Sequence, residues 1–194
     1  MIIQVPQFLI DHAYQTKRPC NVVVTQPRRL AAVSVARRVC EERGFEPGTV
    51  VGYHVGLDKK VGKDNLVTFM TTGVLLQKLT KMKSLRSWTH IIVDEVHERD
   101  LHTDLLLLFI KKILKDDVRR RETHVKVILM SATLKSEQFS DYFEMENKAR
   151  GRTIKPPVIK IKSSSRQFTV EEIYLDDLVG DKVSLTTLFA GVFE

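Results

Sequence analysis

The stretch HIIVDEVHERD, residues 90–100, places an apolar run directly before a group of charged side chains. Residues 90–94 have the length and the β-branched character of a buried strand. A strand that is apolar on both faces is typical of a parallel sheet with helices on either side. In such sheets, functional residues gather in the loops at the carboxyl ends of the strands. Asp94 and Glu95, which close this strand, are therefore the first candidates for a functional site.

The rest of the chain alternates short apolar runs with longer amphipathic stretches. The runs predict β-strands, and the amphipathic stretches predict α-helices. We expect the run Leu105–Ile110 to lie in the core. This alternation predicts an α/β fold, in which a mainly parallel sheet is covered by helices on both faces. The expected strands are 21–27, 49–55, 65–70, 90–94 and 125–130, and the expected helices are 28–44, 71–82, 103–117 and 135–143.

Length and charge narrow the class of protein. The 194 residues suit one domain, or one domain with an appendage. The net charge of +7 is compatible with a polyanionic partner, although a basic domain that binds no nucleic acid would have the same charge. No apolar stretch reaches the length of a membrane span, and the first residues lack the basic region of a signal peptide. We therefore expect a cytoplasmic protein with no membrane partner.

The adjacent carboxylates of Asp94 and Glu95 need compensation at the end of an apolar strand. A Mg²⁺ ion bound to nucleotide phosphates is a natural partner for such a pair. In that interpretation Asp94 holds Mg²⁺, directly or through water, and Glu95 orients or deprotonates the attacking water. The alternative is a solvated pair that caps a helix. For the sequence DEVHER after three apolar residues, we favour the metal-binding interpretation.

Polar residues also follow the other predicted strands. The segment TQPRR places Thr25, Arg28 and Arg29 at a helix start, where free N–H groups and guanidinium groups bind phosphate. Arginines at the positive end of a helix are unfavourable without an anion, so a solvated basic turn is the less favoured alternative. The segments TTG (71–73) and SAT (131–133) carry hydroxyl groups at equivalent places, although such residues are also routine in helix caps and turns.

The four motifs TQPRR, TTG, DEVH and SAT occur in this order, each at the end of its own predicted strand. In this order they closely resemble the first RecA-like domain of a DEAH/RHA-family RNA helicase of superfamily 2, over residues 4–175. The resemblance implies a RecA-like sheet of the P-loop NTPase type and an RNA-dependent ATPase with ATP and Mg²⁺ as cofactors. It also implies RNA as a partner, held by backbone contacts that are independent of sequence and sensitive to salt.

The resemblance implies a role for individual residues at these strand ends. Asp94 and Glu95 act on Mg²⁺ and on the hydrolytic water. An exposed helix arginine without a nucleotide role is the alternative for Arg38. The other implied roles are coupling of hydrolysis to domain movement by His97, Ser131 and Thr133, contact with the RNA sugar-phosphate backbone by Thr25, Arg28, Arg29 and Thr71, and stacking on adenine by Arg38.

Three segments narrow the resemblance to one branch of the family. GYHVGLDKK has Gly56 where many members have an arginine, so one usual RNA contact would be missing. Together with MTTGVLLQKL and TVEEIYLDDL, this segment resembles the Spindle-E branch, the Tudor-domain-containing DEAH-box helicases of the germline piRNA pathway. That branch implies a second RecA-like domain and a Tudor domain in the parent chain. It also implies piRNA-pathway protein partners, transposon silencing and a place in cytoplasmic perinuclear granules.

The phosphate-binding motif GxxxxGK[ST] of RecA-like ATPases does not occur in the sequence. In the resembled family this loop directly precedes a segment like QVPQ, residues 4–7. We therefore expect the first strand and the loop to lie upstream of residue 1, and the chain alone to be ATPase-deficient. The expected organisation is a truncated first RecA-like domain at 1–147, a basic segment and strand at 148–178, and an unplaced tail at 179–194.

Other functions are compatible with the same motifs. The chain could be an RNA-binding module without catalysis, or a protein-interaction platform built on a RecA-like surface. A DEAH-box helicase of another RNA pathway would carry the same residues. Measurements of ATP turnover and of salt-dependent RNA binding separate these hypotheses.

Overall fold

The computed structural model describes residues 2–120, 125–132, 136–147, 152–161 and 174. The chain divides into two units, residues 1–158 and 159–194, and the fold below is that of the first unit. Parts of the basic segment and strand expected at 148–178, and the whole tail expected at 179–194, lie outside the described residues. The expected domain boundaries therefore stay predictions.

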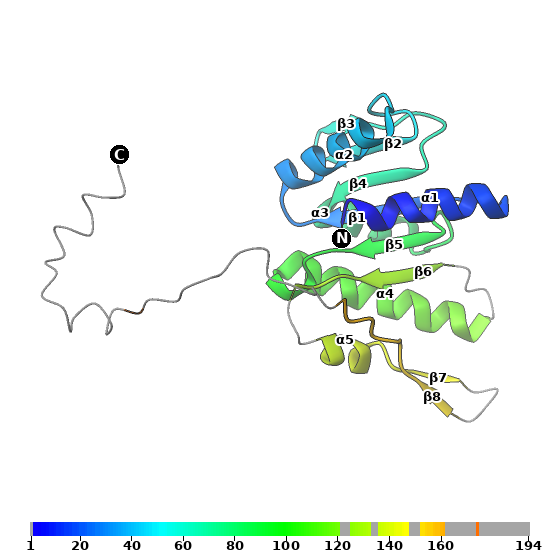
Figure 1. The fold of residues 1–194 in the computed structure, drawn as a ribbon. Helices are drawn as coiled ribbons and strands as arrows, with labels where there is room; N and C mark the ends of the chain where they lie inside the picture. Colours follow the sequence, from blue (N-terminus) through cyan, green and yellow to red (C-terminus); the bar gives the residue numbers. More distant parts are fainter. Residues whose placement is uncertain (1, 121–124, 133–135, 148–151, 162–173, 175–194) are drawn as a thin grey trace, which may run out of the picture. The chain divides into compact units, whose positions relative to one another are not determined.

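A six-stranded sheet forms the centre of the first unit, with the strands in the order β3-β2-β4-β1-β5-β6 (Figure 1). Neighbouring strands are parallel except β2 and β3, which are antiparallel. The mainly parallel α/β sheet predicted from the sequence is confirmed, and β3 and β6 form its two edges. The strands are β1 (Val22–Gln26), β2 (Val51–Val55), β3 (Asp58–Lys60), β4 (Val67–Thr71), β5 (His90–Val93) and β6 (Lys126–Leu129).

The helices and the strands of this sheet alternate along the chain as the sequence predicts, apart from β2, β3 and β4, which follow one another without a helix between them. Gly44 ends α2 with a positive φ of 64°, a conformation that glycine adopts without strain. Every helix and strand predicted within the described residues is found, within a few residues of its expected bounds. The helices are α1 (Gln4–Thr16), α2 (Arg29–Arg43), α3 (Thr72–Met82), α4 (Leu101–Arg120) and α5 (Ser136–Tyr142), with a 3-10 turn, η1 (Val96–Glu98).

The sequence does not predict two short elements. One is β3, and the other is an antiparallel hairpin of β7 (Met145–Asn147) and β8 (Arg152–Ile154). All three side chains of β3 are charged and exposed. Such a strand has no apolar alternation to reveal it, and its backbone pairing with β2 defines it instead.

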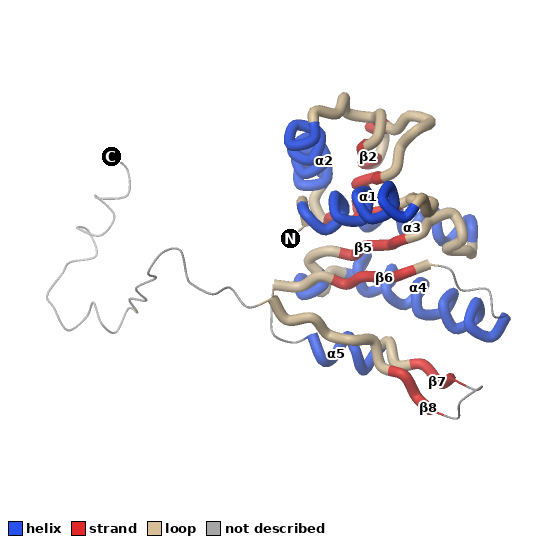
Figure 2. The backbone as a smooth tube through the Cα atoms, turned by 45° about the vertical axis from the view of Figure 1, so that its right-hand side comes forward, coloured by secondary structure: helices blue, strands red, loops and turns tan. Residues whose placement is uncertain are grey.

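Two hydrophobic cores cover the two faces of the sheet. Val22 and Val24 of β1 belong to the core that contains residues of α1 and α2, whereas Val23 belongs to the core that contains residues of α3 and α4. Ile92 and Ile91 of β5 alternate in the same way. Figures 1 and 2 show α1 on one side of the strands and α4 on the other. Because both faces are covered, polar ligands are restricted to the strand ends.

The leucines of α4 correct the expectation that the whole run Leu105–Ile110 lies in the core. Leu106 and Ile110 are fully buried, but Leu105 is 37% exposed and Leu108 is 52% exposed. Successive residues of a helix point in different directions, so a continuous apolar run cannot face a sheet on one side only. Despite this run, no helix in the described part of the chain is long and apolar enough to cross a membrane.

A polar network joins α1 to α2. The guanidinium group of Arg43 donates hydrogen bonds of 2.9 and 2.6 Å to the carboxylate of Asp11, and another to the amide oxygen of Gln7. The hydrogen bonds from Arg43 hold the pKa of Asp11 below its ordinary value of 3.8. A lowered pKa means that the ionised carboxylate stabilises the fold. This contribution is present above the unfolded-state pKa and is lost as the pH falls through the folded-state pKa.

We therefore expect Arg43→Ala to lower stability at about pH 7, and the difference from the unsubstituted chain to shrink below about pH 3. Urea unfolding, followed by circular dichroism at both pH values, measures the difference in free energy of unfolding between the variant and the unsubstituted chain. Arg37→Ala removes an exposed arginine of the same helix and should lower stability at neither pH. A difference of equal size at both pH values would contradict the role of Asp11.

Candidate functional site

The parallel strands bring the four sequence motifs to one edge of the sheet. Thr71 at the end of β4 pairs with Gln26 at the end of β1. The neighbouring residue Thr25 pairs with Val93 of β5, and Val93 pairs with Leu129 of β6. TTG, TQPRR, DEVH and the start of SAT therefore follow neighbouring strands in that order. The predicted position of each motif at the end of its own strand is confirmed within the described residues. We refer to Thr71, Gln26, Asp94 and Met130 as the strand-end row.

The chain turns sharply after β5, in the loop that contains Asp94 and Glu95. Glu95 has a left-handed backbone conformation with φ 54°, and Arg99 on the other side of η1 has φ 52°. For residues other than glycine this conformation costs about 1 kcal/mol or more, and such residues cluster at functional sites. The N–H of Val96 donates to the carbonyl of Met130 at 3.2 Å. The loop is thereby attached to the end of β6.

Asp94 is a buried carboxylate with an unfavourable environment for its charge. It is only 9% exposed, and the Nε2 of Gln26 donates to its Oδ2 at 2.5 Å. Burial raises the pKa of Asp94 above its ordinary value, and the charge of Glu95 adds to this, while hydrogen bonds from the Glu95 N–H and from Gln26 oppose it. Because the net direction is upward, the ionised form is destabilised at neutral pH. A nearby cation would relieve this destabilisation.

The two carboxylates fit Mg²⁺, which typically binds one or two carboxylates and completes its shell with phosphate oxygens and water. Asp94 would hold the ion, and the side chain of Glu95, 38% exposed, is accessible to a water molecule. Among the described residues, no group of three or more His, Cys, Asp or Glu side chains could hold a metal by itself. The residues therefore fit a metal shared with a nucleotide, but they include no phosphate-binding motif for that nucleotide.

His97 lies in η1, between the carboxylate loop and the start of SAT. Its Nδ1 accepts a hydrogen bond from the Ala132 N–H at 3.4 Å and lies 3.4 Å from Oε2 of Glu95. The two contacts exclude each other, because Nδ1 accepts from Ala132 only when it carries no hydrogen and donates to Glu95 only when it carries one. Ser131 is half-buried, and Thr133 lies outside the described residues. The coupling role of His97, Ser131 and Thr133 stays a prediction.

Arg28 and Arg29 lie at the start of α2, and both side chains are exposed. Arg28 pairs with Glu98 at 3.3 Å. The guanidinium carbon of Arg29 lies 3.8 Å from the position that a Cβ atom would take on Gly56. Arg29 therefore places a cation beside the turn at Gly56, the position at which the sequence analysis predicts that an RNA contact is missing.

The first turns of the helices that follow β1 and β4 contain no acidic side chain that would compete with a bound anion. These helices are α2 and α3, and neither has a side-chain hydrogen bond at its N-cap. The N-cap of α3 is Thr71, which is half-buried. The N–H groups of these first turns can therefore bind an anion such as phosphate.

Thr25 and Arg38, for which the sequence predicts ligand contacts, contact other groups of the protein in this structure. Thr25 is fully buried, and its hydroxyl group donates to the carbonyl of Ile92 at 3.5 Å. Contact between Thr25 and RNA stays a prediction, which its burial does not favour. Arg38 is exposed and forms an ion pair with Glu42 one helical turn away, at 2.8 Å. Both the adenine-stacking role of Arg38 and the solvent-exposed alternative stay open.

Sequence reasoning missed Gln26 and Glu98, which contact the motif on the neighbouring strand. Gln26 donates to Asp94, and Glu98 accepts from Arg28. A signal for Gln26 was available, because a polar side chain at the end of a buried strand needs a hydrogen-bond partner. The sequence had no comparable signal for Glu98, since an exposed acidic residue in a loop needs no partner.

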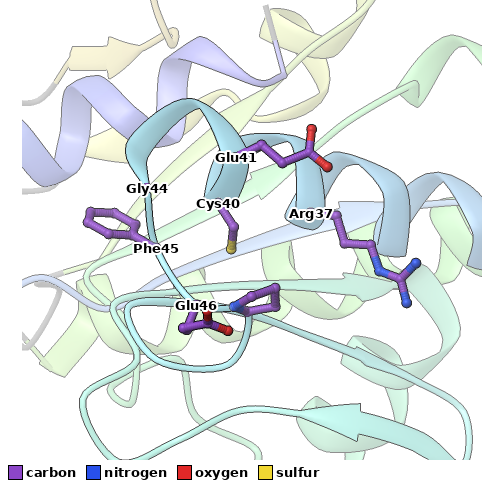
Figure 3. A pocket seen from close by; sticks show the side chains of 7 residues that line it. Arg37, Cys40, Glu41, Gly44, Phe45 and Glu46 are labelled. Carbon is purple, nitrogen blue, oxygen red and sulfur yellow. The ribbon is translucent and has the colours of Figure 1, made fainter.

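A hollow of about 380 Å³ lies away from this site, at the end of α2 (Figure 3). Helix α2 begins at the carboxyl edge of the sheet, after β1, and ends at the opposite edge, before β2. The lining combines apolar side chains with charges of both signs, and it includes none of the predicted site residues. The lining residues are Arg37, Cys40, Glu41, Gly44, Phe45, Glu46 and Pro47.

Comparison with known proteins gives matches over nearly the whole chain. The chain is 49% identical over 177 residues to the "Probable ATP-dependent RNA helicase spindle-E" of Drosophila pseudoobscura pseudoobscura. It is 44% identical over 180 residues to the protein of the same name from Culex quinquefasciatus. It is also 45% identical over 177 residues to the "ATP-dependent RNA helicase TDRD9" of Rattus norvegicus. A scan against models of protein families finds no match.

These matches cover 90%, 93% and 90% of this chain and 12% of each relative. The chain thus spans about one-eighth of the length of the curated relatives that it matches. The mainly parallel sheet with helices on both faces is consistent with a RecA-like domain. Over nine-tenths of its length, the chain is homologous to proteins named as spindle-E and TDRD9 ATP-dependent RNA helicases.

Proposed function

We propose that this chain is the RNA-facing and water-activating part of the first RecA-like domain of an ATP-dependent RNA helicase. In the full-length protein, ATP hydrolysis is coupled to RNA binding and remodelling. The observation that carries the proposal is that paired carboxylates and paired arginines follow neighbouring strands at one sheet edge. Homology to proteins named as ATP-dependent RNA helicases supports it.

On the nucleotide side, Asp94 would hold the Mg²⁺ ion of a bound nucleotide, and Glu95 would orient or deprotonate the attacking water. The bound ion would supply charge stabilisation for the phosphoryl group that the water attacks. The contact between His97 and the Ala132 N–H links this loop to the SAT segment. Arg38 stacks on adenine only if its ion pair with Glu42 opens. Because the sequence has no phosphate-binding motif, we propose that this chain alone turns over little or no ATP.

On the RNA side, Arg28 and Arg29 bind phosphates of the RNA backbone, together with the N–H groups at the starts of α2 and α3. Thr71 lies at the second of these starts. Such contacts position the RNA without reading its sequence. The positive net charge of the chain supports a polyanionic partner.

The resemblance to the Spindle-E branch supports a finer proposal. The full-length protein also contains a second RecA-like domain and a Tudor domain, and it acts with piRNA-pathway proteins in transposon silencing in germline granules. Loss of transposon repression in germ cells that lack the protein tests this role. Unchanged repression would favour a DEAH-box helicase of another RNA pathway.

Replacing both arginines tests the RNA-binding surface. We expect Arg28→Ala with Arg29→Ala to weaken binding of the full-length protein to single-stranded RNA about tenfold, because two charge-assisted phosphate contacts are lost. The slope of log affinity against log salt should fall by about 1.4, at about 0.7 for each contact. Fluorescence anisotropy with labelled RNA at several salt concentrations measures both quantities.

A control variant separates a specific site from net charge. Lys112→Ala with Lys115→Ala removes the same charge from exposed positions of α4 and should change the affinity by less than about twofold. Equal losses in the two variants would contradict a phosphate site at the strand ends. RNA binding without ATP turnover in the full-length protein would favour the non-catalytic RNA-binding module. If the unsubstituted full-length protein neither binds RNA nor hydrolyses ATP but retains a protein partner, that result would favour the protein-interaction platform.

A further inference from the structure

We propose that Gln26 is a positioning residue that couples the RNA-side arginines to the nucleotide-side carboxylate of Asp94. The inference rests on the proposed helicase function and gives it a physical link between the two ligands. Gln26 ends β1, and Arg28 follows two residues later. In this role Gln26 touches neither RNA nor nucleotide. It acts through Asp94.

The contact between Gln26 and Asp94 is buried on both sides. Gln26 is 6% exposed, and its Nε2 lies 2.5 Å from Oδ2 of Asp94. A hydrogen bond to a charged acceptor is stronger than one between neutral groups, and stronger in a buried site than in water. The bond holds one carboxylate oxygen and so restricts rotation of the group. A shift at the end of β1 is therefore transmitted to Asp94.

A second contact joins the same two segments at the surface. Arg28 pairs with Glu98 at 3.3 Å, and the side chain of Arg28 is 78% exposed. An exposed pair of this kind adds little stability, so an RNA phosphate competes for Arg28 at low cost. When Arg28 turns to a phosphate, Glu98 loses its partner and η1 loses one attachment. RNA binding is thus sensed at both ends of the segment 94–98.

The backbone of this segment favours a switch between two positions. Left-handed residues, Glu95 and Arg99, stand on both sides of η1. Strained positions of this kind persist only while the surrounding contacts hold them. Gln26 and Arg28 supply two of those contacts from the neighbouring strand end. A change in either contact therefore alters the placement of the carboxylates.

Substitutions at position 26 separate the hydrogen bond from packing. Methionine has nearly the volume of glutamine but no N–H donor, so Gln26→Met removes the bond and leaves no cavity. Glutamate retains the shape but sets a third carboxyl group beside Asp94 and Glu95. Like charges at this distance oppose one another, so Gln26→Glu should disturb the link at least as strongly.

The experiment measures the affinity of the full-length protein for labelled single-stranded RNA, with and without Mg·ADP–aluminium fluoride. The ratio of the two dissociation constants is the coupling ratio. In the Gln26→Met protein, we expect the RNA affinity without nucleotide to stay within about twofold of the wild-type value. The coupling ratio should move about five- to tenfold closer to one. Asn65→Ala is the control, because it removes half-buried amide hydrogen bonds just before β4, at the opposite edge of the sheet. It should leave the coupling ratio unchanged.

The possible outcomes separate this inference from the proposed function. A folded Gln26→Met protein with the wild-type coupling ratio overturns the inference and leaves the helicase function intact. A wild-type protein that binds RNA and hydrolyses ATP without coupling overturns the inference together with the coupling that the proposed function includes. A wild-type protein with neither activity overturns both. If thermal unfolding shows that both Gln26 variants fail to fold, the surface variant Glu98→Gln decides. A coupling ratio of the Glu98→Gln protein that differs from the wild-type ratio by about twofold or more supports the inference, and an unchanged coupling ratio overturns it.

Discussion

Replacing Glu95 with glutamine is expected to reduce the RNA-stimulated ATP turnover of the full-length protein by about 10²- to 10⁴-fold. Glutamine retains the size of the side chain but cannot accept a proton from the attacking water. RNA affinity should stay within about twofold, because the phosphate contacts at Arg28 and Arg29 are unchanged. Phosphate release at saturating RNA measures turnover, and fluorescence anisotropy measures RNA binding.

The matched control is Glu41→Gln on α2. Glu41 is an exposed carboxylate that lines the hollow in Figure 3, away from the strand-end row. Its replacement should leave turnover within about twofold. If Glu95→Gln retained more than about a tenth of the turnover, the assignment of Glu95 to the water would be wrong. A parallel loss of RNA affinity would instead indicate a general disturbance of the fold.

Leu106→Ala is expected to destabilise the chain by about 2–5 kcal/mol, because it opens a cavity in the core between the sheet and α4. Leu106 is fully buried. Leu108→Ala removes the same atoms from the same helix, where the side chain is 52% exposed, and should cost about 1 kcal/mol or less. Urea unfolding of the 194-residue chain measures both free energies.

Similar losses for the two leucines would show that the outer face of α4 is buried in solution. That outcome would contradict the exposure of Leu108, and a rise in molecular mass with concentration would reveal self-association as its cause. A small loss for Leu106 would show that the core beside α4 relaxes into the space that the leucine leaves.

The fold could be predicted from the sequence to the extent that local patterns encode it. Continuous apolar runs identify the central strands, and amphipathic spacing with a terminal Gly44 identifies α2. The parallel arrangement follows because both faces of such strands must be covered. Asp94 and Glu95 could be located at the strand-end edge for the same reason, since they directly follow an apolar run.

The remaining features depend on contacts between distant segments. Gln26 and Asp94 are 68 residues apart in the chain, so no local pattern reveals their hydrogen bond. The burial of Thr25 follows from its pairing with Val93 on the next strand, which brings its hydroxyl group near a backbone carbonyl instead of a ligand. The leucine run of α4 misled the core prediction, because a run has no period from which the buried side can be chosen.

The two edge strands of the sheet differ in how readily they can pair with a further strand. β3 is antiparallel to its neighbour and exposes charged side chains, which discourage a further strand. β6 is parallel to β5 and carries the half-buried Val127, Ile128 and Leu129, and within the described residues it has a strand on one side only. A parallel strand added beside β6 would end next to Met130 and Ser131. Additional polypeptide can therefore extend the sheet beside β6, on the flank for which we propose nucleotide binding, whereas the charges of β3 disfavour such an extension at the other edge.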